Sequence, residues 1–251
     1  MELNTYPLVC TRGVVLYPNQ EIVIDVGRGA SVHAVENAQD NYDKKICLFS
    51  QKELEQENPG KEDIYPVGTL CEVRHIRRFD NFLRVKFRGI KRVKLNNWIN
   101  GSLSDLAEVE ILESEKQDAV EEEALIRMIA DELDRMQGQD RFVTKEIVME
   151  ISKGMGGEFL SDKAVQGLPL DIERKQQYLE TLGVNDRLMM LLQDMAKEKK
   201  MSEVEKQINE TVKERIDQGQ KDYYLREKMN VIREELGDTV AQDEDAAKIR
   251  K

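Results

Sequence analysis

A thiol and an imidazole lie close together in the sequence, at Cys71 and His75, and both groups are common zinc ligands. They fall in a region whose pattern predicts β structure. Residues four apart in a strand share a face but lie roughly 13 Å from each other. No second pair of ligands completes a tetrahedral set, so we interpret Cys71 as a buried thiol and His75 as incidental, and expect no metal site.

A serine–lysine pair, Ser152 and Lys153, could supply a nucleophile and its base. Adjacent residues on a helix point in different directions, however, and no oxyanion-stabilising element is recognisable nearby. Few residues are available as the base of a serine–histidine–aspartate triad, because the chain contains only 2 histidines, His33 and His75. We therefore predict that this chain holds no catalytic residues and is not an enzyme.

Two glycine-containing segments bear on cofactor binding. Gly60-Lys61 is followed by Glu62 and lacks the upstream glycine of a phosphate-binding loop, so we interpret it as an ordinary loop. Gly27-Arg28-Gly29 lacks the third glycine of a dinucleotide-binding motif, which favours a tight turn. We expect no cofactor in this chain.

Charge is segregated along the chain, whose 251 residues carry a formal net charge of −11. From Cys71 to Lys94, nine basic and two acidic residues give +7, whereas from Ser102 to Asp134 two basic and twelve acidic residues give −10. The basic segment could dock polyphosphate, nucleic acid or an acidic partner. It could equally face the acidic segment or be a solvated strand face, and we favour this second interpretation.

The three cysteines, Cys10, Cys47 and Cys71, are widely spaced and odd in number, which argues against a disulfide framework. The first ten residues lack the pattern of a signal peptide, and no stretch approaches the roughly 18 apolar residues of a membrane span. We expect reduced thiols in a soluble cytoplasmic protein that does not bind membranes.

The first third of the chain shows the period-two alternation of β structure. In Glu21–Val26 every second residue is apolar, and Leu83, Val85 and Phe87 share one face of a later run. A short helix should run from Ser31, as its N-cap, to Asn41. The expected strands are Pro7–Leu16, broken at Gly13, Glu21–Val26, Ile46–Phe49, Thr69–Val73, Leu83–Phe87 and Val93–Leu95. Short strands with one helix predict a small, partly closed β-barrel.

Helical periodicity begins near Ser114. One helix should carry Val120 to Leu133 and end before Gly138, and a second should cover Lys145 to Ser152. Four methionines, Met189, Met190, Met195 and Met201, fall in a later helical stretch. They could form an adaptable binding surface or fill a core, and we favour the core.

A single long helix is predicted from Asp186 to Leu236, because apolar residues recur there mostly three, four or seven apart. About 50 residues at 1.5 Å each would extend roughly 75 Å, and a one-sided apolar stripe is typical of coiled coils. Gly219 is a candidate bend, break or hinge, since glycine costs a helix about 1 kcal/mol relative to alanine. Gly237 should end the helix, leaving an acidic tail from Asp238.

Two stretches resemble the N-terminal region of bacterial Lon proteases. Arg12-Gly13-Val14-Val15-Leu16-Tyr17-Pro18, Val26-Gly27-Arg28, Tyr65-Pro66-Val67-Gly68-Thr69 and Phe87-Arg88-Gly89-Ile90-Lys91-Arg92 resemble landmarks of the Lon β-domain. Gln220 to Asp238, QKDYYLREKMNVIREELGD, is similar to the signature helix that ends that region, and Leu182 to Leu192 resembles the segment before it. The departures from the family pattern lie mainly between about Arg135 and Gln177, and the turn near Phe79 to Phe82 is shortened to Asp80-Asn81.

The resemblance implies an α+β fold. A PUA-like pseudo-β-barrel with one helix should occupy residues 1–113, followed by an all-α helical subdomain over 114–185. A long coiled-coil-like helix over 186–237 should lead to an ATPase domain that this chain does not include, and 238–251 should form the acidic flexible tail.

The resemblance also implies a function. Lon proteases are cytoplasmic homo-hexamers of the AAA+ class that degrade misfolded and short-lived regulatory proteins with a Ser-Lys dyad, using ATP and Mg²⁺ bound in the ATPase domain. This chain would be the non-catalytic region that recognises unfolded substrate and supports hexamer assembly. The residues that we predict to contact substrate are Tyr17, Pro18, Met201, Tyr223, Tyr224 and Met229.

Two other classes of function fit parts of the sequence. A free-standing interaction module of the same domain type would also lack catalytic motifs, but it has no need of a long transmission helix. Nucleic-acid binding is associated with whole Lon proteins, yet the net charge of −11 argues against placing it in this chain.

Overall fold

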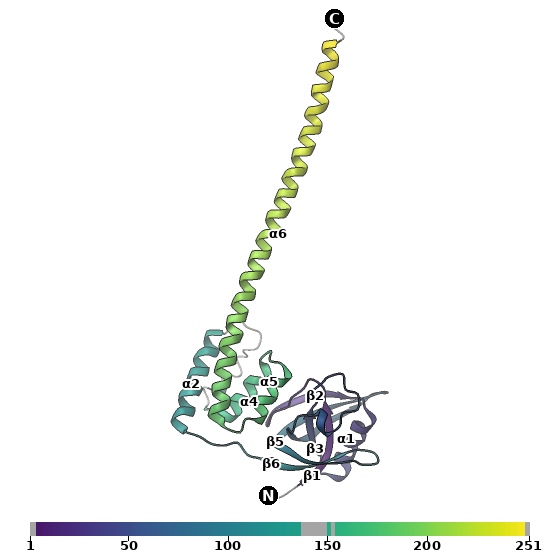
Figure 1. Ribbon diagram of the computed structural model, residues 1–251, viewed down its shortest axis with the longest axis vertical. Helices are drawn as coiled ribbons and strands as arrows, with labels where there is room; N and C mark the ends of the chain where they lie inside the picture. The colour runs from purple at the N-terminus through teal and green to yellow at the C-terminus, as the bar shows by residue number, and fades with distance from the viewer. Residues whose placement is uncertain (1–3, 137–149, 152–153, 249–251) are drawn as a thin grey trace. The chain divides into compact units, whose positions relative to one another are not determined.

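The computed structural model describes residues 4–136, 150–151 and 154–248, with the side chains of the last helix described through Glu235. The chain divides into two compact units, Met1–Ala196 and Lys197–Lys251. Figure 1 shows six strands with α1 among them in the first part of the chain, followed by the remaining helices, α2, α4, α5 and α6.

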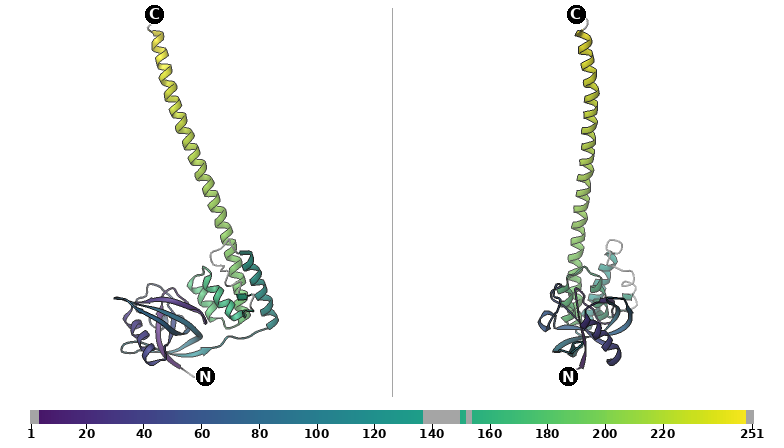
Figure 2. Two further views of the ribbon diagram at one scale, coloured as in Figure 1. Left: turned by 180° about the vertical axis from the view of Figure 1, so that it is seen from behind. Right: turned by 90° about the vertical axis from the view of Figure 1, so that its right-hand side faces the viewer.

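The first unit begins with a curved β-sheet. Its strands are β1 (Asn4–Thr11), β2 (Glu21–Val26), β3 (Lys45–Ser50), β4 (Val67–Arg78), β5 (Leu83–Ile99) and β6 (Leu106–Leu112). The strand order is β2-β5-β4-β3-β1-β6, and β6 also pairs with β5. That extra pairing closes a ring of β5, β4, β3, β1 and β6, and the strands curve around one interior in both views of Figure 2.

The barrel is closed at only one end, as the sequence predicted. β5 pairs with β6 from Arg92 to Ile99, but with β2 from Leu83 to Arg88. β2 has no second strand partner within the described chain, so the sheet is open there. Two expectations were wrong in detail, because the runs around Phe87 and Leu95 are one continuous strand and because β6 was not anticipated.

Gly89 explains the continuous β5 strand. A Cβ atom at this position would lie 2.2 Å from the carbonyl oxygen of Tyr17, so only glycine allows the loop after β1 to pack directly on β5. Two backbone hydrogen bonds, Asn19 N–H to Gly89 O and Gly89 N–H to Gln20 O, both 2.9 Å, fix this contact. The glycine is therefore a packing requirement inside the strand and not a strand end.

Helix α1 (Gly29–Asn41) packs on the barrel, with Ala34, Val35 and Ala38 fully buried. The expected N-cap was wrong: Arg28 occupies the N-cap position, three residues before Ser31, and Ser31 is buried within the first turn. No side chain caps the α1 N-terminus, and the first-turn N–H groups are left without a capping partner. The Gly27-Arg28-Gly29 turn leads straight into this helix.

Three helices follow the barrel within the first unit: α2 (Ala119–Met136), α4 (Gly157–Gly167) and α5 (Ile172–Glu180). Asp118 caps α2 by accepting from the N–H groups of Val120 and Glu121, and Asp171 caps α5 by accepting from Arg174 N–H at 2.7 Å. The helix that we expected over Lys145–Ser152, and the Ser152–Lys153 pair, lie largely outside the described residues.

The hydrophobic core of the first unit joins barrel and helices. One cluster lies between α1 and the sheet, and a second fills the closed end of the barrel around Phe49 and Val93. A third combines Val15, Tyr17 and Val67 of the β region with apolar residues of α2, α4, α5 and the start of α6, such as Leu160 and Leu188. The helices are thus packed onto the outside of the barrel.

Helix α6 (Val184–Lys248) begins in the first unit and makes up the second. The predicted stop at Gly237 was wrong, because the helix continues to Lys248. No proline follows Pro169, and the residues after Gly237 include good helix formers, so one glycine penalty of about 1 kcal/mol is offset. Within the described residues, no helix combines the length and the hydropathy that crossing a membrane would require.

Candidate protein-binding site

Tyr17 and Pro18 are not exposed, which corrects the prediction that their loop contacts substrate. Tyr17 is 0% exposed and Pro18 is buried. The Tyr17 hydroxyl donates to the carbonyl oxygen of Lys175 in α5 at 2.7 Å, and burial raises its pKa. The aromatic-proline loop therefore fastens the barrel to the helices. An aromatic residue beside proline signals neither role by itself, because both a binding loop and an interdomain wedge use the same residue types.

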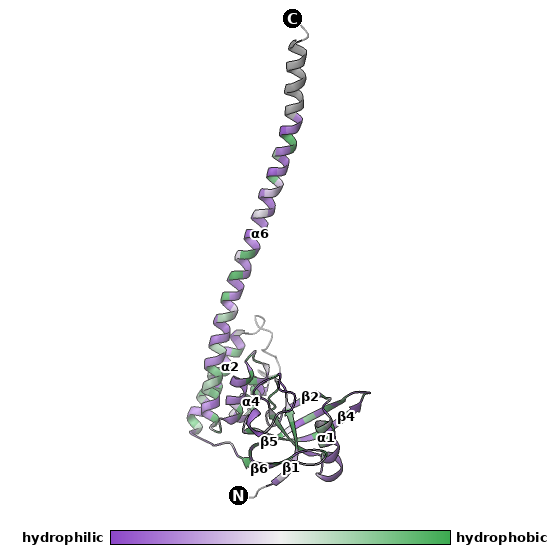
Figure 3. Ribbon diagram, turned by 45° about the vertical axis from the view of Figure 1, so that its right-hand side comes forward, coloured by the Kyte–Doolittle hydropathy of each residue, from purple (hydrophilic) through white to green (hydrophobic). Residues whose placement is uncertain are grey.

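The other predicted contact residues lie on the surface of α6 in the second unit. Tyr223 is 71% exposed and Met229 is 53% exposed, and Met201 and Tyr224 are exposed as well. They belong to a series of exposed apolar residues that we name the α6 stripe: Met201, Val204, Ile208, Val212, Ile216, Tyr223, Met229 and Ile232. Figure 3 shows apolar segments recurring between hydrophilic ones along α6. Their role in binding stays a prediction.

Gly219 lies within α6, which runs through it without interruption. The predicted break is therefore not observed. A Cβ atom at this position would meet no other atom within 4 Å, so no packing contact requires glycine here. The hinge stays a prediction.

The methionines of α6 divide between core and surface. Met195 is fully buried and Met190 packs against the core, as we predicted, whereas Met189 and Met201 are exposed. Exposure does not simply follow the boundary between the two units, because Met189 is exposed although it belongs to the first unit.

A buried ionic cluster, which no pattern in the sequence predicts, joins the barrel to the helices. Arg92 of β5 makes a two-pronged ion pair with Asp162 of α4, with Nη1 and Oδ2 3.0 Å apart, and its Nε donates to Leu179 O at 3.1 Å. Arg187 of α6 lies on the other side of Asp162, with Nε 3.9 Å from Oδ1. Each of these three side chains is at most 2% exposed.

Burial dominates the electrostatics of this cluster. It raises the pKa of Asp162, although the guanidinium groups of Arg92 and Arg187 oppose the shift. Burial also lowers the pKa of Arg187 to about 10, and the positive charge of Arg92 adds to that shift. Arg187 further donates to Ser161 Oγ and to Thr181 O at 3.2 and 2.9 Å. All these groups satisfy one another, so the cluster is structural.

The basic side chains between Cys71 and Lys94 lie on a solvated strand face, which is the interpretation that we favoured, with the exception of the buried Arg92. Arg84 pairs with Asp25 at 2.7 Å and Lys86 pairs with Glu21 at 2.7 Å, both across the β2–β5 ladder. Lys91 pairs with Glu113 of the acidic segment at 2.7 Å. These exposed pairs neutralise much of the local charge, which weakens the case for a polyanion site on this face.

The cysteines are free thiols, as predicted. Burial raises the pKa of Cys71, and the side chain is fully buried while His75 is exposed, so the two do not form a ligand pair. Across the part of the chain that the structure describes, no group of three or more candidate ligand residues could hold a metal.

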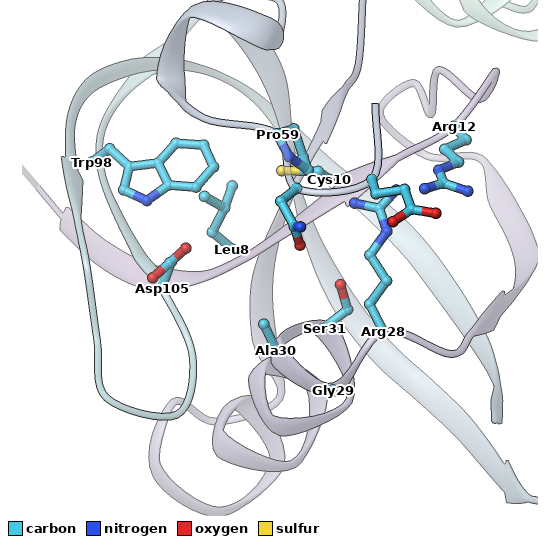
Figure 4. A pocket seen from close by; sticks show the side chains of 12 residues that line it. Leu8, Cys10, Arg12, Arg28, Gly29, Ala30, Ser31, Pro59, Trp98 and Asp105 are labelled. Carbon is cyan, nitrogen blue, oxygen red and sulfur yellow. The ribbon is translucent and has the colours of Figure 1, made fainter. Parts of the chain in front are cut away.

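A cleft in the first unit lies beside β1. It encloses about 510 Å³ and lies between the end of β1, the first turn of α1 and the loop around Pro59. Figure 4 shows Leu8 and Trp98 toward one end and the guanidinium groups of Arg12 and Arg28 toward the other, with Cys10 between them. We name this site the β1 cleft.

The chemistry of the β1 cleft suits binding and not catalysis. Burial raises the pKa of the Cys10 thiol to about 12, so it stays protonated and is a poor nucleophile. Arg28 donates to Gln51 Oε1, and Arg12 Nη2 donates to Gln56 O at 3.3 Å. Burial lowers the pKa of Arg28 and the charge of Arg12 lowers it further, whereas Cys10 and the carboxylate of Glu57 oppose the shift.

Comparison with known proteins gives consistent results. Residues 5–197 match the family model of the ATP-dependent protease La (LON) substrate-binding domain. The chain is 33% identical over 233 residues to the Lon protease of Brevibacillus choshinensis, covering 92% of this chain and 30% of that protein. It is 32% identical over 247 residues to the Lon protease of Escherichia coli strain K12, covering 98% and 31%. The chain thus spans about a third of the length of these relatives.

Solved structures share the fold. The N-terminal domain of a Mycobacterium avium complex Lon protease superposes with a TM-score of 0.63 at 17% identity, covering 77% of this chain and 98% of that one. A Lon N-terminal domain protein from Xanthomonas campestris gives a TM-score of 0.53 at 16% identity, covering 75% and 97%.

Proposed function

Because the chain belongs to the Lon substrate-binding domain family, we propose that it captures unfolded or misfolded polypeptides and delivers them to a protease. The family match over residues 5–197 carries this proposal, because it covers the whole barrel and the helices packed on it. The β1 cleft supplies a concave surface with both apolar and charged walls, which suits peptide recognition.

We further propose that this chain is the N-terminal part of a cytoplasmic, ATP-dependent protease. Support comes from relatives that are named Lon protease and are about three times as long. An ATPase domain that binds ATP and Mg²⁺ and a Ser-Lys peptidase domain would follow this region. The same relatives favour this proposal over a free-standing interaction module.

Binding of an unfolded client tests the proposal directly. A fluorescent, chemically unfolded protein and its native form would be titrated with the 251-residue chain and followed by anisotropy. Selective binding of the unfolded form at micromolar affinity or better is expected. Equal binding of both forms, or binding of neither, would exclude substrate capture by this region.

A second role, self-association, is favoured by the α6 stripe. Eight exposed apolar residues recur on one helix, and within the described chain nothing covers them. An uncovered stripe of this kind is stable in water chiefly when it packs against another helix. We propose that α6 pairs with α6 of other copies in a homo-hexamer. Sedimentation of the chain over a range of concentrations should show association, and a strictly monomeric chain would contradict it.

A further inference from the structure

The edge of β1 is only partly used by the sheet. β6 pairs with Asn4 to Pro7, whereas β3 pairs on the other side with Leu8 to Thr11. Beyond Pro7, the edge that faces β6 therefore has no strand partner in the described chain. Such an edge can accept an extended peptide by main-chain hydrogen bonding.

The hydrogen bonds of neighbouring residues identify the groups on this edge. Leu8 N–H donates to Asp105 O at 3.1 Å, so the polar groups of Leu8 face the β6 side of the strand, and its N–H is already bonded there. Thr11 O accepts from Gln51 N–H at 2.9 Å, so the carbonyl of Thr11 faces β3. Because backbone groups alternate along a strand, the N–H and C=O of Cys10 face the open edge. Cys10 lines the β1 cleft.

A second cavity adjoins the first along this edge. It encloses about 330 Å³ and lies between Val9 to Arg12 of the β1 side and Ile24 to Arg28 of the β2 side. The two cavities share Cys10, Arg12, Arg28 and Ser31. The arginines therefore stand where both cavities meet, beside a strand edge that is free to pair.

Arg12 and Arg28 retain capacity for an anion. Their described hydrogen bonds are one each, to Gln56 O and to Gln51 Oε1, and neither forms an ion pair among the described residues. The carboxylate of Glu57, which lines the same cleft, attracts Arg28 from a longer distance and offsets part of its charge. The first turn of α1, whose N–H groups lack a side-chain cap, lines the same cavity through Gly29, Ala30 and Ser31. Guanidinium groups and free helix N–H groups both favour a carboxylate.

The rest of the lining limits what the anion can be. Leu8 and Trp98 offer an apolar wall, and Glu57 and Asp105 add two acidic groups to the cleft. A polyanion such as nucleic acid or polyphosphate would be repelled by those carboxylates. A single carboxylate attached to an apolar chain meets less of this repulsion than a polyanion does, because it brings only one charge into the cleft. The arginines and the apolar wall, which would take the two parts of such a ligand, lie toward opposite ends of the cleft (Figure 4).

We propose that the β1 cleft binds the extended carboxyl-terminal segment of a polypeptide, with the terminal carboxylate held by Arg12 and Arg28. The main chain of the segment pairs with Cys10, and an apolar side chain packs on Leu8 and Trp98. A terminal carboxylate is continuous with an extended main chain and ends every polypeptide, so this recognition is compatible with many client sequences. The inference rests on the proposed function and names a substrate class for it.

The test compares one peptide in two forms. A ten-residue apolar peptide, labelled at its amino end, would carry either a free carboxylate or a carboxamide at its other end. Anisotropy with the whole chain should show about ten-fold tighter binding of the free acid, as expected for loss of charge-assisted hydrogen bonds. Arg12→Ala and Arg28→Ala should each remove most of this preference.

Two comparisons and a stability measurement serve as controls for this test. Arg84→Ala removes an arginine that is paired with Asp25 on the outer β2–β5 face, and it should leave the preference unchanged. Arg28→Ala also breaks the bond to Gln51, so Arg12→Ala, which loses only a contact to Gln56 O, provides the second measurement. Thermal unfolding of each variant checks that the barrel is intact.

Equal affinity for acid and amide would overturn the proposal. A preference for the acid that persists in both arginine variants would also overturn it, and so would the finding that polyphosphate displaces the acid. These outcomes are distinct from failure of the proposed function. If an unfolded client still binds while acid and amide are equivalent, only the carboxylate site is wrong. If no unfolded client binds, substrate capture itself is wrong.

Discussion

The junction between barrel and helices and the surface of α6 reverse the usual relation between residue type and burial. At the junction, Arg92 and Arg187 are among the largest fully buried side chains. On α6, Ile208 is 56% exposed and Tyr223 is 71% exposed. Whether a side chain is buried thus depends on whether the chain supplies groups that pack against it or pair with it. Asp162 and nearby carbonyl groups satisfy the guanidinium groups, whereas nothing in the described chain covers the α6 stripe.

The two regions should therefore respond differently to mutation. The junction is complete within one chain, so its residues should determine the free energy of unfolding of the first unit. The stripe is incomplete, so its residues should determine association and leave that free energy unchanged. Each prediction below tests one side of this contrast.

The largest effect is expected for Asp162→Ala. This change leaves Arg92 and Arg187 buried without a counter-charge, and breaking a buried ion pair in this way costs about 3–5 kcal/mol. Urea unfolding measures the loss. Asp25→Ala removes the partner of Arg84 at the exposed β2–β5 face and should change stability far less. Similar losses in the two variants would show that burial is not what makes the junction strong.

Loss of apolar side chains from the stripe should weaken association. Burying an isoleucine side chain contributes about 1.5–3 kcal/mol. Ile208→Ser combined with Ile216→Ser should therefore raise the protein concentration at which half of the chains are associated by at least ten-fold. Sedimentation measures this shift. The matched control is Gln207→Ser with Arg215→Ser on the same helix. If the control weakens association equally, the stripe is not the interface.

A moderate effect is expected for Tyr17→Phe. The change removes the hydrogen bond to Lys175 O and leaves that carbonyl without its partner, which costs about 1 kcal/mol. Urea unfolding should detect the loss, while affinity for an unfolded client stays the same. Reduced client affinity at unchanged stability would mean that Tyr17 reaches substrate after all, as the sequence first suggested.

The smallest effect is expected for Gly219→Ala. No neighbouring atom opposes a methyl group here, so the helix should gain up to about 1 kcal/mol of local stability. Amide exchange between residues 215 and 225 should slow by roughly five-fold. Gln218→Ala provides the comparison, since glutamine is already a good helix former. Unchanged exchange in Gly219→Ala would argue against a weak point at this glycine.

Much of the fold could be predicted from the sequence because it depends on local periodicity. The alternation in Glu21–Val26 and in Leu83–Phe87 identified the buried face of each strand, and the three-four spacing after Asp186 identified α6. These patterns need only the geometry of one element. The family resemblance rested on the same local segments.

The candidate site could be predicted only in part. The sequence drew attention to Tyr17 and to the exposed residues of α6. It placed the two arginines of the β1 cleft in an expected strand (Arg12) and in an expected turn (Arg28), and assigned neither a role in binding. Arg12 and Arg28 are sixteen positions apart, and what brings them together is the pairing of β1 with β3 and the position of α1. No local pattern contains that information.

Arg92 illustrates the difference between what the sequence predicts and what only the tertiary structure shows. By sequence, Arg92 belongs to the same basic segment as Arg84 and Lys86, which we expected to form a solvated strand face. Whether an outer face meets water or another element depends on residues far away in the chain. Arg84 meets solvent, whereas Asp162, 70 positions from Arg92, covers it with a counter-charge. The sequence by itself determined the direction of each side chain, and the tertiary structure decided what each would contact, because burial depends on packing between distant segments.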